Sequence, residues 1–147
     1  MITICCLPNI SVAFEIPEYK VVWSTGTTYG ILFQQMLTDN EIEKIIFEFR
    51  EIRKRNEFNK YFPVPKNYKG DDPYGVLQFS FFTDPKWASN IMNKRFNNNK
   101  MSKSQCQKYF DNTRGYYGWS RNPHHERGSI GDKFGDIRSK NYRELFK

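Results

Sequence analysis

The densest group of side chains capable of chemistry lies between residues 119 and 136. It contains the chain's two histidines, His124 and His125, followed by Glu126 and two bases, Arg127 and Lys133. A nuclease needs a general base, a group that protonates the leaving oxygen and cations that hold the phosphate. One histidine with Arg127 and Lys133 could fill these roles, so a small nuclease using His124, His125 and Glu126 is one hypothesis.

The spacing of these residues favours a loop feature over a catalytic centre. Adjacent histidines point in different directions in extended backbone. The chain has no H-x-x-x-H, H-E-x-x-H or C-x-x-C spacing that would hold a metal. We therefore expect no metal and no cofactor, and a protein that is not an enzyme.

The charge of the chain is divided unevenly between its two ends. Residues 1–49 carry a net charge of −4 and residues 50–147 one of +11, which together give the overall +7. A strongly basic region of this kind is typical of a protein that binds a polyanion. We expect nucleic acid, with RNA favoured, or an acidic protein surface as the partner.

Aromatic residues are interleaved with these bases, most densely from Arg114 to Arg121. Bases of a single strand stack on exposed rings while Lys and Arg neutralise its phosphates. We predict that Arg114, Tyr116, Tyr117, Trp119 and Arg121 form a stacking or gripping loop that turns its rings outward. The predicted phosphate contacts are Arg53, Lys54, Arg55, Lys94, Arg95, Arg127 and Lys133. The alternative is that the rings build the core, because the chain has few Leu and Val residues.

Part of the basic region resembles a known RNA-binding segment. Arg114-Gly115-Tyr116, followed by Lys133-Phe134-Gly135 and Arg143-Glu144-Leu145, is similar to the C-terminal rRNA-binding segment of a family of small-subunit ribosomal proteins. The likeness covers about a quarter of the chain, needs a long insertion between its halves and lacks the closing residues of that family. It supports RNA as the partner and does not assign the chain to the family.

The elements that must position these residues are read from hydrophobic periodicity. Apolar runs and alternation predict strands over residues 2–7, 10–16, 19–24, 29–36 and 76–82. An isoleucine stripe behind a Thr38–Glu41 capping box predicts a helix over 39–55. Further helices are expected over 85–96, starting at Asp84, and over 103–112. Five glycines between 115 and 136 predict irregular backbone, followed by a last helix capped by Asp136.

Together these elements predict a single α+β domain in which two main helices pack on a mostly antiparallel sheet. Residues 1–100 form the core, and residues 101–147 form a basic, irregular or helical C-terminal extension within the same domain. The mean hydropathy of −0.77 and the lack of any long uncharged apolar window exclude a membrane span.

Cysteine usage and composition bear on the compartment and the source. Cys5 and Cys6 are adjacent and Cys106 is isolated, which argues against a disulfide framework and for the cytoplasm or another reducing compartment. Abundant Lys, Asn, Ile, Phe and Tyr, which A/T-rich codons encode, suggest an A/T-rich genome such as those of many phages, large viruses, organelles or protists.

Three functions follow, in order of preference. The first is a non-enzymatic nucleic-acid-associated protein, a component of a ribonucleoprotein or viral assembly. The alternative is a small phage or viral protein that binds and inhibits a host protein. The third is the nuclease centred on His124 and His125.

Overall fold

A computed structural model describes residues 14–64, 66 and 68–147 of this chain. The strand predicted over 2–7, and the first part of the one predicted over 10–16, lie outside these residues. Residues 14–18 are described and are not in a strand. No helix in the described part of the chain has the length and apolar character needed to cross a membrane.

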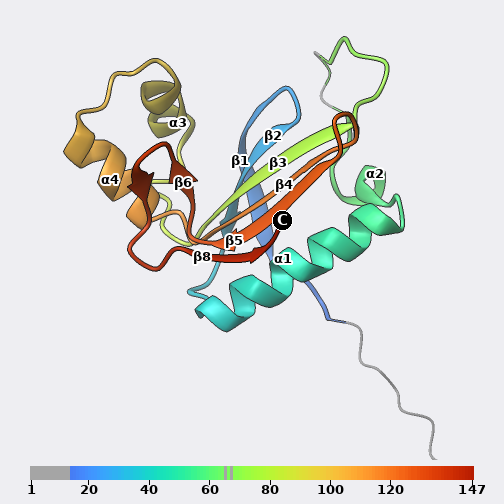
Figure 1. Cartoon of the computed structure of the whole chain (residues 1–147), viewed down its shortest axis with the longest axis horizontal. Helices are drawn as coiled ribbons and strands as arrows, with labels where there is room; N and C mark the ends of the chain where they lie inside the picture. Colours follow the sequence, from blue (N-terminus) through green and yellow to red (C-terminus); the bar gives the residue numbers. More distant parts are fainter. Residues whose placement is uncertain (1–13, 65, 67) are drawn as a thin grey trace, which may run out of the picture.

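A six-stranded sheet forms the centre of the molecule, in the order β1-β2-β3-β4-β5-β8 (Figure 1). Only the β2–β3 pair is parallel, and every other neighbouring pair is antiparallel. Its strands are β1 (Tyr19–Thr25), β2 (Thr28–Phe33), β3 (Val76–Phe82), β4 (Gly115–Ser120), β5 (His125–Ile130) and β8 (Arg143–Phe146). The predicted α+β class with a mostly antiparallel sheet is confirmed.

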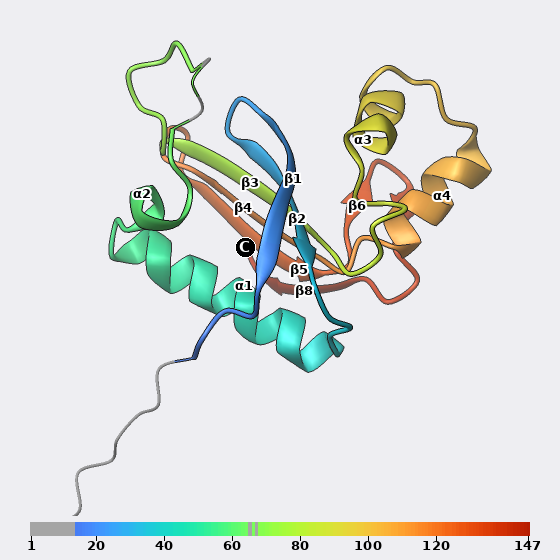
Figure 2. The same cartoon turned by 180° about the vertical axis from the view of Figure 1, so that it is seen from behind.

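Helix α1 (Asp39–Lys54) covers one face of this sheet and connects β2 to β3 (Figure 2). The predicted capping box is present: the Glu41 carboxylate accepts from the Thr38 backbone N–H at 2.7 Å, and the Thr38 hydroxyl accepts from the Glu41 N–H at 3.3 Å. The predicted isoleucine stripe is buried against Leu77, Phe79 and Phe81 of β3. A short helix, α2 (Phe58–Tyr61), closes this core with Phe58 and Phe62.

A lobe lies on the face of the main sheet opposite α1. It consists of α3 (Asn90–Asn97), α4 (Lys103–Asp111) and the small hairpin of β6 (Lys133–Phe134) and β7 (Ile137–Arg138). It packs on a second apolar cluster that includes Trp23, Phe82 and Phe110. Figures 1 and 2 show the lobe beside one end of the strands, on the other side of the sheet from α1. Among the described residues, no other helix lies on that face of the sheet.

The helix predicted from Asp84 begins five residues later. Asp84 instead accepts the Lys86 backbone N–H at 2.8 Å and closes a turn, and the cap of α3 is Ser89, whose hydroxyl accepts from Met92 N–H at 3.2 Å. The turn carries Ala88 into the second apolar cluster, where it is buried. The helix predicted over 103–112 is confirmed as α4, with the Ser102–Gln105 capping box.

The prediction of irregular backbone over 115–136 is wrong, because β4 and β5 form an antiparallel hairpin inside the sheet. The glycines of this hairpin reflect close packing. A Cβ at Gly115 would lie 2.6 Å from Cγ2 of Ile42, so α1 approaches the sheet only where this side chain is absent. The helix predicted after Asp136 is also wrong: this segment forms β7 and β8, so the C-terminal region supplies three strands of the main sheet.

Candidate nucleic-acid interface

A cleft of about 360 Å³ lies between the open face of the sheet and the lobe. Alternation along the strands builds its floor: Phe79 and Tyr117 face α1, so Ser80 and Tyr116 face the cleft. Gln78 of β3 and Arg127 of β5 lie on the same face. The lobe supplies the opposite wall, with Asn93, Phe96, Asn97, Tyr109, Phe110, Lys133 and Phe134.

Two aromatic rings lie flat against glycines on this face of the sheet. A Cβ at Gly30 would be 2.2 Å from the Trp23 ring, and one at Gly118 would be 2.3 Å from the Tyr116 hydroxyl oxygen. The glycines therefore let both rings settle onto the backbone. The Arg127 guanidinium lies over the Tyr116 ring at 4.2 Å from its centroid, within cation–π distance.

Charged groups meet at the lobe end of the cleft. Arg127 donates to the Asp132 carboxylate at 2.9 Å, and the Lys133 backbone N–H donates to the same oxygen at 2.7 Å. Burial raises the pKa of Asp132 to about 6, although the Arg127 charge acts in the opposite direction. Lys133 extends over the Tyr142 ring at 5.1 Å and has no carboxylate within ion-pair distance among the described residues.

Several polar groups of the cleft are not used by the protein. Asn93 is only 5% exposed, and its Oδ1 accepts from Nδ2 of Asn97 at 3.2 Å. The Asn93 amide donates to none of the described residues. The indole N–H of Trp23 is buried and has no acceptor in the part of the chain that the structure describes. Buried donors without a partner are uncommon in proteins and often mark a place where a ligand or water binds.

A separate charged network lies on the α1 face of the sheet. Glu126 is buried and accepts from Arg50 at 3.0 Å, from Arg53 at 2.9 Å and from the Tyr117 hydroxyl at 2.8 Å. Burial alone would raise the pKa of Glu126, but the hydrogen bonds from Tyr117 and the arginines hold it below its usual value. This network connects α1 to β4 and β5, so it is structural.

The predicted gripping loop does not exist. Its residues lie in or beside strand β4, and Tyr117 is fully buried with its hydroxyl bonded to Glu126, so the prediction that Tyr117 stacks on nucleic acid is wrong. Trp119 is half-buried between the guanidiniums of Arg53 and Arg121, at 5.5 and 5.7 Å. Of the three rings, Tyr116 alone lines the cleft. Rings in a protein poor in Leu and Val are needed for the core.

The bases predicted to bind nucleic acid, from the phosphate contacts and from the gripping loop, divide into two groups. On α1 and in or beside the sheet they are already paired: Arg53 with Glu126, Lys54 with Glu51, Arg55 with Glu48 and Glu57, Arg114 with Asp39, Arg121 with Asp72, and Arg127 with Asp132. In the lobe, Lys94 and Arg95 belong to α3, and Lys133 lines the cleft beside Arg127. The structure thus brings together Arg127, Lys133 and Tyr116 out of the predicted set.

The residues of the nuclease hypothesis are not brought together. His124 and His125 are exposed at the turn between β4 and β5, whereas Glu126 points to the opposite face of the strand into its buried network. Among the residues that the structure describes, no group of three or more His, Cys, Asp or Glu side chains could hold a metal ion.

Sequence reasoning missed most of the cleft. Trp23, Ser80, Asn93, Phe96 and Phe134 were not candidates, yet all of them line it. One signal was present: Gln78 and Ser80 alternate with Leu77, Phe79 and Phe81, which indicates a strand with one polar face. No pattern in the sequence indicated that α3 lines the cleft, because its position depends on how the lobe packs over the sheet.

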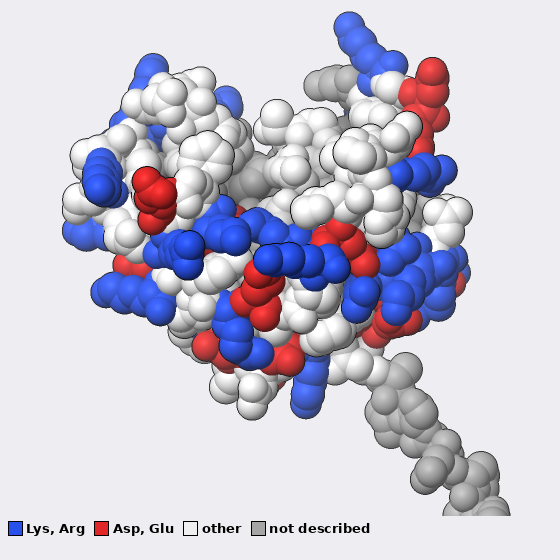
Figure 3. Space-filling view, viewed as in Figure 1, with Lys and Arg blue, Asp and Glu red and all other residues white. Residues whose placement is uncertain are grey.

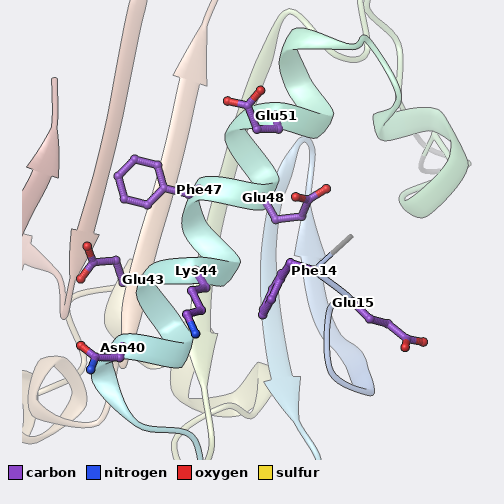
Figure 4. A pocket seen from close by; sticks show the side chains of 8 residues that line it. All are labelled: Phe14, Glu15, Asn40, Glu43, Lys44, Phe47, Glu48 and Glu51. Carbon is purple, nitrogen blue, oxygen red and sulfur yellow. The ribbon is translucent and has the colours of Figure 1, made fainter. Parts of the chain in front are cut away.

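A larger groove, of about 880 Å³, runs along the outer side of α1 (Figure 4). Phe14 faces the helix across this groove, and Glu43, Glu48 and Glu51 project from the helix. Each of these three carboxylates is already paired, with Arg143, Arg55 and Lys54 respectively. These three bases are thus paired with carboxylates of the groove, and we do not include the groove in the candidate interface.

Basic side chains lie on the lobe and in a band across one face of the molecule. Figure 3 shows this band, with Asp and Glu among the Lys and Arg, running below the notch beside the lobe and on to the region where α1 ends. The bases of the lobe that form no ion pair with any described carboxylate are Lys94, Arg95, Lys100, Lys103, Lys108, Lys133 and Arg138.

Comparisons with protein families, curated proteins and solved structures found no match for this chain.

Proposed function

We propose that this chain is a non-enzymatic protein that associates with nucleic acid, with RNA as the favoured partner. The cleft and the adjoining bases of the lobe form the proposed binding surface. One observation carries the proposal: Arg127 and Lys133 line the same cleft as the Tyr116 and Phe134 rings and the Asn93 amide, which donates to none of the described residues. Surfaces that bind single strands combine cations, which contact the phosphates, with aromatic rings, on which the bases stack.

The distribution of charge supports the same surface. The α1 and sheet bases are largely neutralised by carboxylates, whereas the bases of the lobe are not. The net charge of +7 therefore acts mainly from the lobe end of the molecule. Binding of this kind releases counterions from the nucleic acid, so its affinity falls steeply as salt rises.

Binding rather than catalysis is proposed because the histidines do not meet a phosphate surface. His124 and His125 lie at the β4–β5 turn, at the far end of β5 from Ile130 and the Asp132 region that borders the cleft. A general base must be within hydrogen-bond reach of the proton that it removes.

Fluorescence anisotropy with labelled RNA and DNA strands over a salt series tests the proposal. We expect log affinity to fall linearly with log salt, with a slope of about −0.7 for each phosphate contact on a single strand. Lys133→Gln should weaken binding and reduce the steepness of this slope by about 0.7, the value of one phosphate contact on a single strand.

Lys44→Gln is the matched control, because it removes the same charge from the groove on the far side of α1. This variant should bind like the parent chain. Absence of binding at low salt, or binding that salt does not affect, would contradict the proposal and favour an acidic protein surface as the partner.

A further inference from the structure

We infer that the cleft receives one unpaired nucleotide, with its base against Phe134 and its phosphate at Lys133, so that the protein selects single strands. This inference rests on the proposed function and names the form of nucleic acid that the site takes. It is carried by the size of the cleft, by an exposed ring at its rim and by the unused donors inside it.

The dimensions of the cleft suit a small unit of a strand. Its volume of about 360 Å³ is at the lower end of the range of small-ligand sites, which is about 300–1,000 Å³. The bases of a duplex are stacked and paired, so a base reaches such a cleft only when it is unpaired. A duplex offers its phosphates and the base edges in its grooves, but no free face of a base on which Phe134 could stack.

Phe134 is the ring best placed to stack on an incoming base. It lines the cleft, yet it is 66% exposed, which is unusual for a phenylalanine. Its ring meets Phe96 edge-on, with centroids 5.5 Å apart and planes at 83°, so the neighbouring ring supports it from the side. A face of Phe134 is therefore available to a base, and every base has a face that stacks.

The interior of the cleft offers donors to the edge of that base. The Trp23 indole N–H is buried against Gly30, so it is not among the donors open to a ligand. The Asn93 amide N–H groups have no acceptor among the described residues, and the Ser80 hydroxyl lies on the floor beside Tyr116. Carbonyl oxygens on the edges of the bases are acceptors that match such donors.

Lys133, which precedes Phe134 in β6, also lines the cleft, and its ammonium lies over the Tyr142 ring without a carboxylate partner among the described residues. This flexible side chain can turn from Tyr142 to the phosphate of the same nucleotide.

The experiment compares three probes on the parent protein by anisotropy: a labelled oligothymidine of about ten nucleotides, an abasic strand of the same length, and a duplex of that length. The abasic strand keeps the phosphates and lacks the bases. We expect the oligothymidine to bind roughly 5- to 150-fold more tightly than the abasic strand, which is the range that stacking of one base supplies.

Phe134→Ala should lower the affinity for oligothymidine to that for the abasic strand. Tyr61→Ala is the matched control, because Tyr61 is an exposed ring (41%) on α2, outside the cleft. Circular dichroism of both variants checks that they fold. The comparison of strands on the parent protein stands independently of either variant.

The outcomes separate this inference from the proposed function. Equal affinity for oligothymidine, abasic strand and duplex, with the expected salt dependence, would overturn the single-nucleotide site and leave nucleic-acid binding in place. An unchanged affinity of a folded Phe134→Ala variant would also overturn it. If none of the three probes binds at low salt, both the site and the proposed function fail.

Discussion

At the scale of single residues, two carboxyl groups show how burial decides the role of a side chain. Glu126 and Asp132 lie at opposite ends of β5 and on different sides of the sheet. Glu126 has three strong donors and is held ionised, whereas Asp132 has one arginine and is buried enough for its pKa to rise to about 6. The first stabilises the fold and the second adjusts the charge of the cleft.

Replacing Glu126 by Gln should lower the free energy of unfolding by about 1–3 kcal/mol, because charged hydrogen bonds are lost and two arginines remain beside the core. The side chains of Arg50 and Arg53 are 30% and 20% exposed. Water can therefore solvate their charges in the variant, which limits the loss of unfolding free energy. Urea denaturation followed by circular dichroism measures the change. Glu51→Gln, at an exposed pair on the same helix, should leave stability unaltered, and a loss as large as that of Glu126→Gln would contradict the structural role.

The raised pKa of Asp132 predicts a pH dependence of stability. The folded chain holds this proton up to about pH 6, whereas the unfolded chain releases it near the ordinary value of 3.8, so folding binds a proton between these limits. The stabilisation of the folded chain by the protonated Asp132 is therefore fully present below pH 3.8, and it is lost as the pH rises through about 6. The groups that face it are Arg127, Lys133, Tyr109 and Tyr116.

The measurement is the difference in unfolding free energy between the parent and Asp132→Asn at several pH values from 4 to 7. This difference should fall as the pH rises, because only the parent carries the carboxyl group. A difference that grows with pH would show that Arg127 outweighs burial and that the pKa of Asp132 is lowered instead.

At the scale of elements, the central feature is the packing of α1 on the β4–β5 hairpin. Ile42 and Ile46 of the helix approach the backbone at Gly115, and Phe146 of β8 covers Gly128. These glycines make the hairpin thin enough for the helix and the edge strand to come close. In the sequence alone, these glycines predicted irregular backbone. The segment forms strands β4 and β5 because α1 and β8 pack against it.

Gly115→Ala tests this packing. The added Cβ would lie 2.6 Å from Ile42 Cγ2, so either the helix shifts or its side chains leave their rotamers. Overpacking of this kind costs about 1–3 kcal/mol of unfolding free energy. Thermal and urea unfolding measure the loss. Ser24→Ala, at an exposed site of β1, provides the control, and equal stability of the two variants would refute the close approach.

At the scale of the whole molecule, one sheet joins regions of opposite charge. Residues 1–49 supply β1, β2 and most of α1, and the basic region 50–147 supplies β3, β4, β5 and β8 together with the lobe. The cleft is lined by both regions, because Trp23 comes from the first and Ser80, Arg127 and Lys133 come from the second. The proposed interface therefore requires the complete sheet.

A chain that ends at residue 100 should not fold cooperatively. It would retain β1, β2 and β3 but leave Phe79 and Phe81 without Tyr117 and Ile130 of the missing strands. It would also expose the edge of β3, which in the sheet pairs with β4. Circular dichroism melting and proton NMR would show a broad transition and poor dispersion. A sharp transition in this fragment would instead establish residues 1–100 as an independent domain.

The sequence by itself determined the local features: the capping box at Thr38, the isoleucine stripe of α1, the helix α4 and the strands β1, β2 and β3. These depend on contacts between residues that are near in the chain. Only the tertiary structure decided that residues 114–146 form strands of the sheet and the small hairpin, because Tyr117, Glu126 and Phe146 contact residues of α1 and β3. Contacts between distant segments leave no periodic pattern in the sequence, and the cleft consists of such contacts.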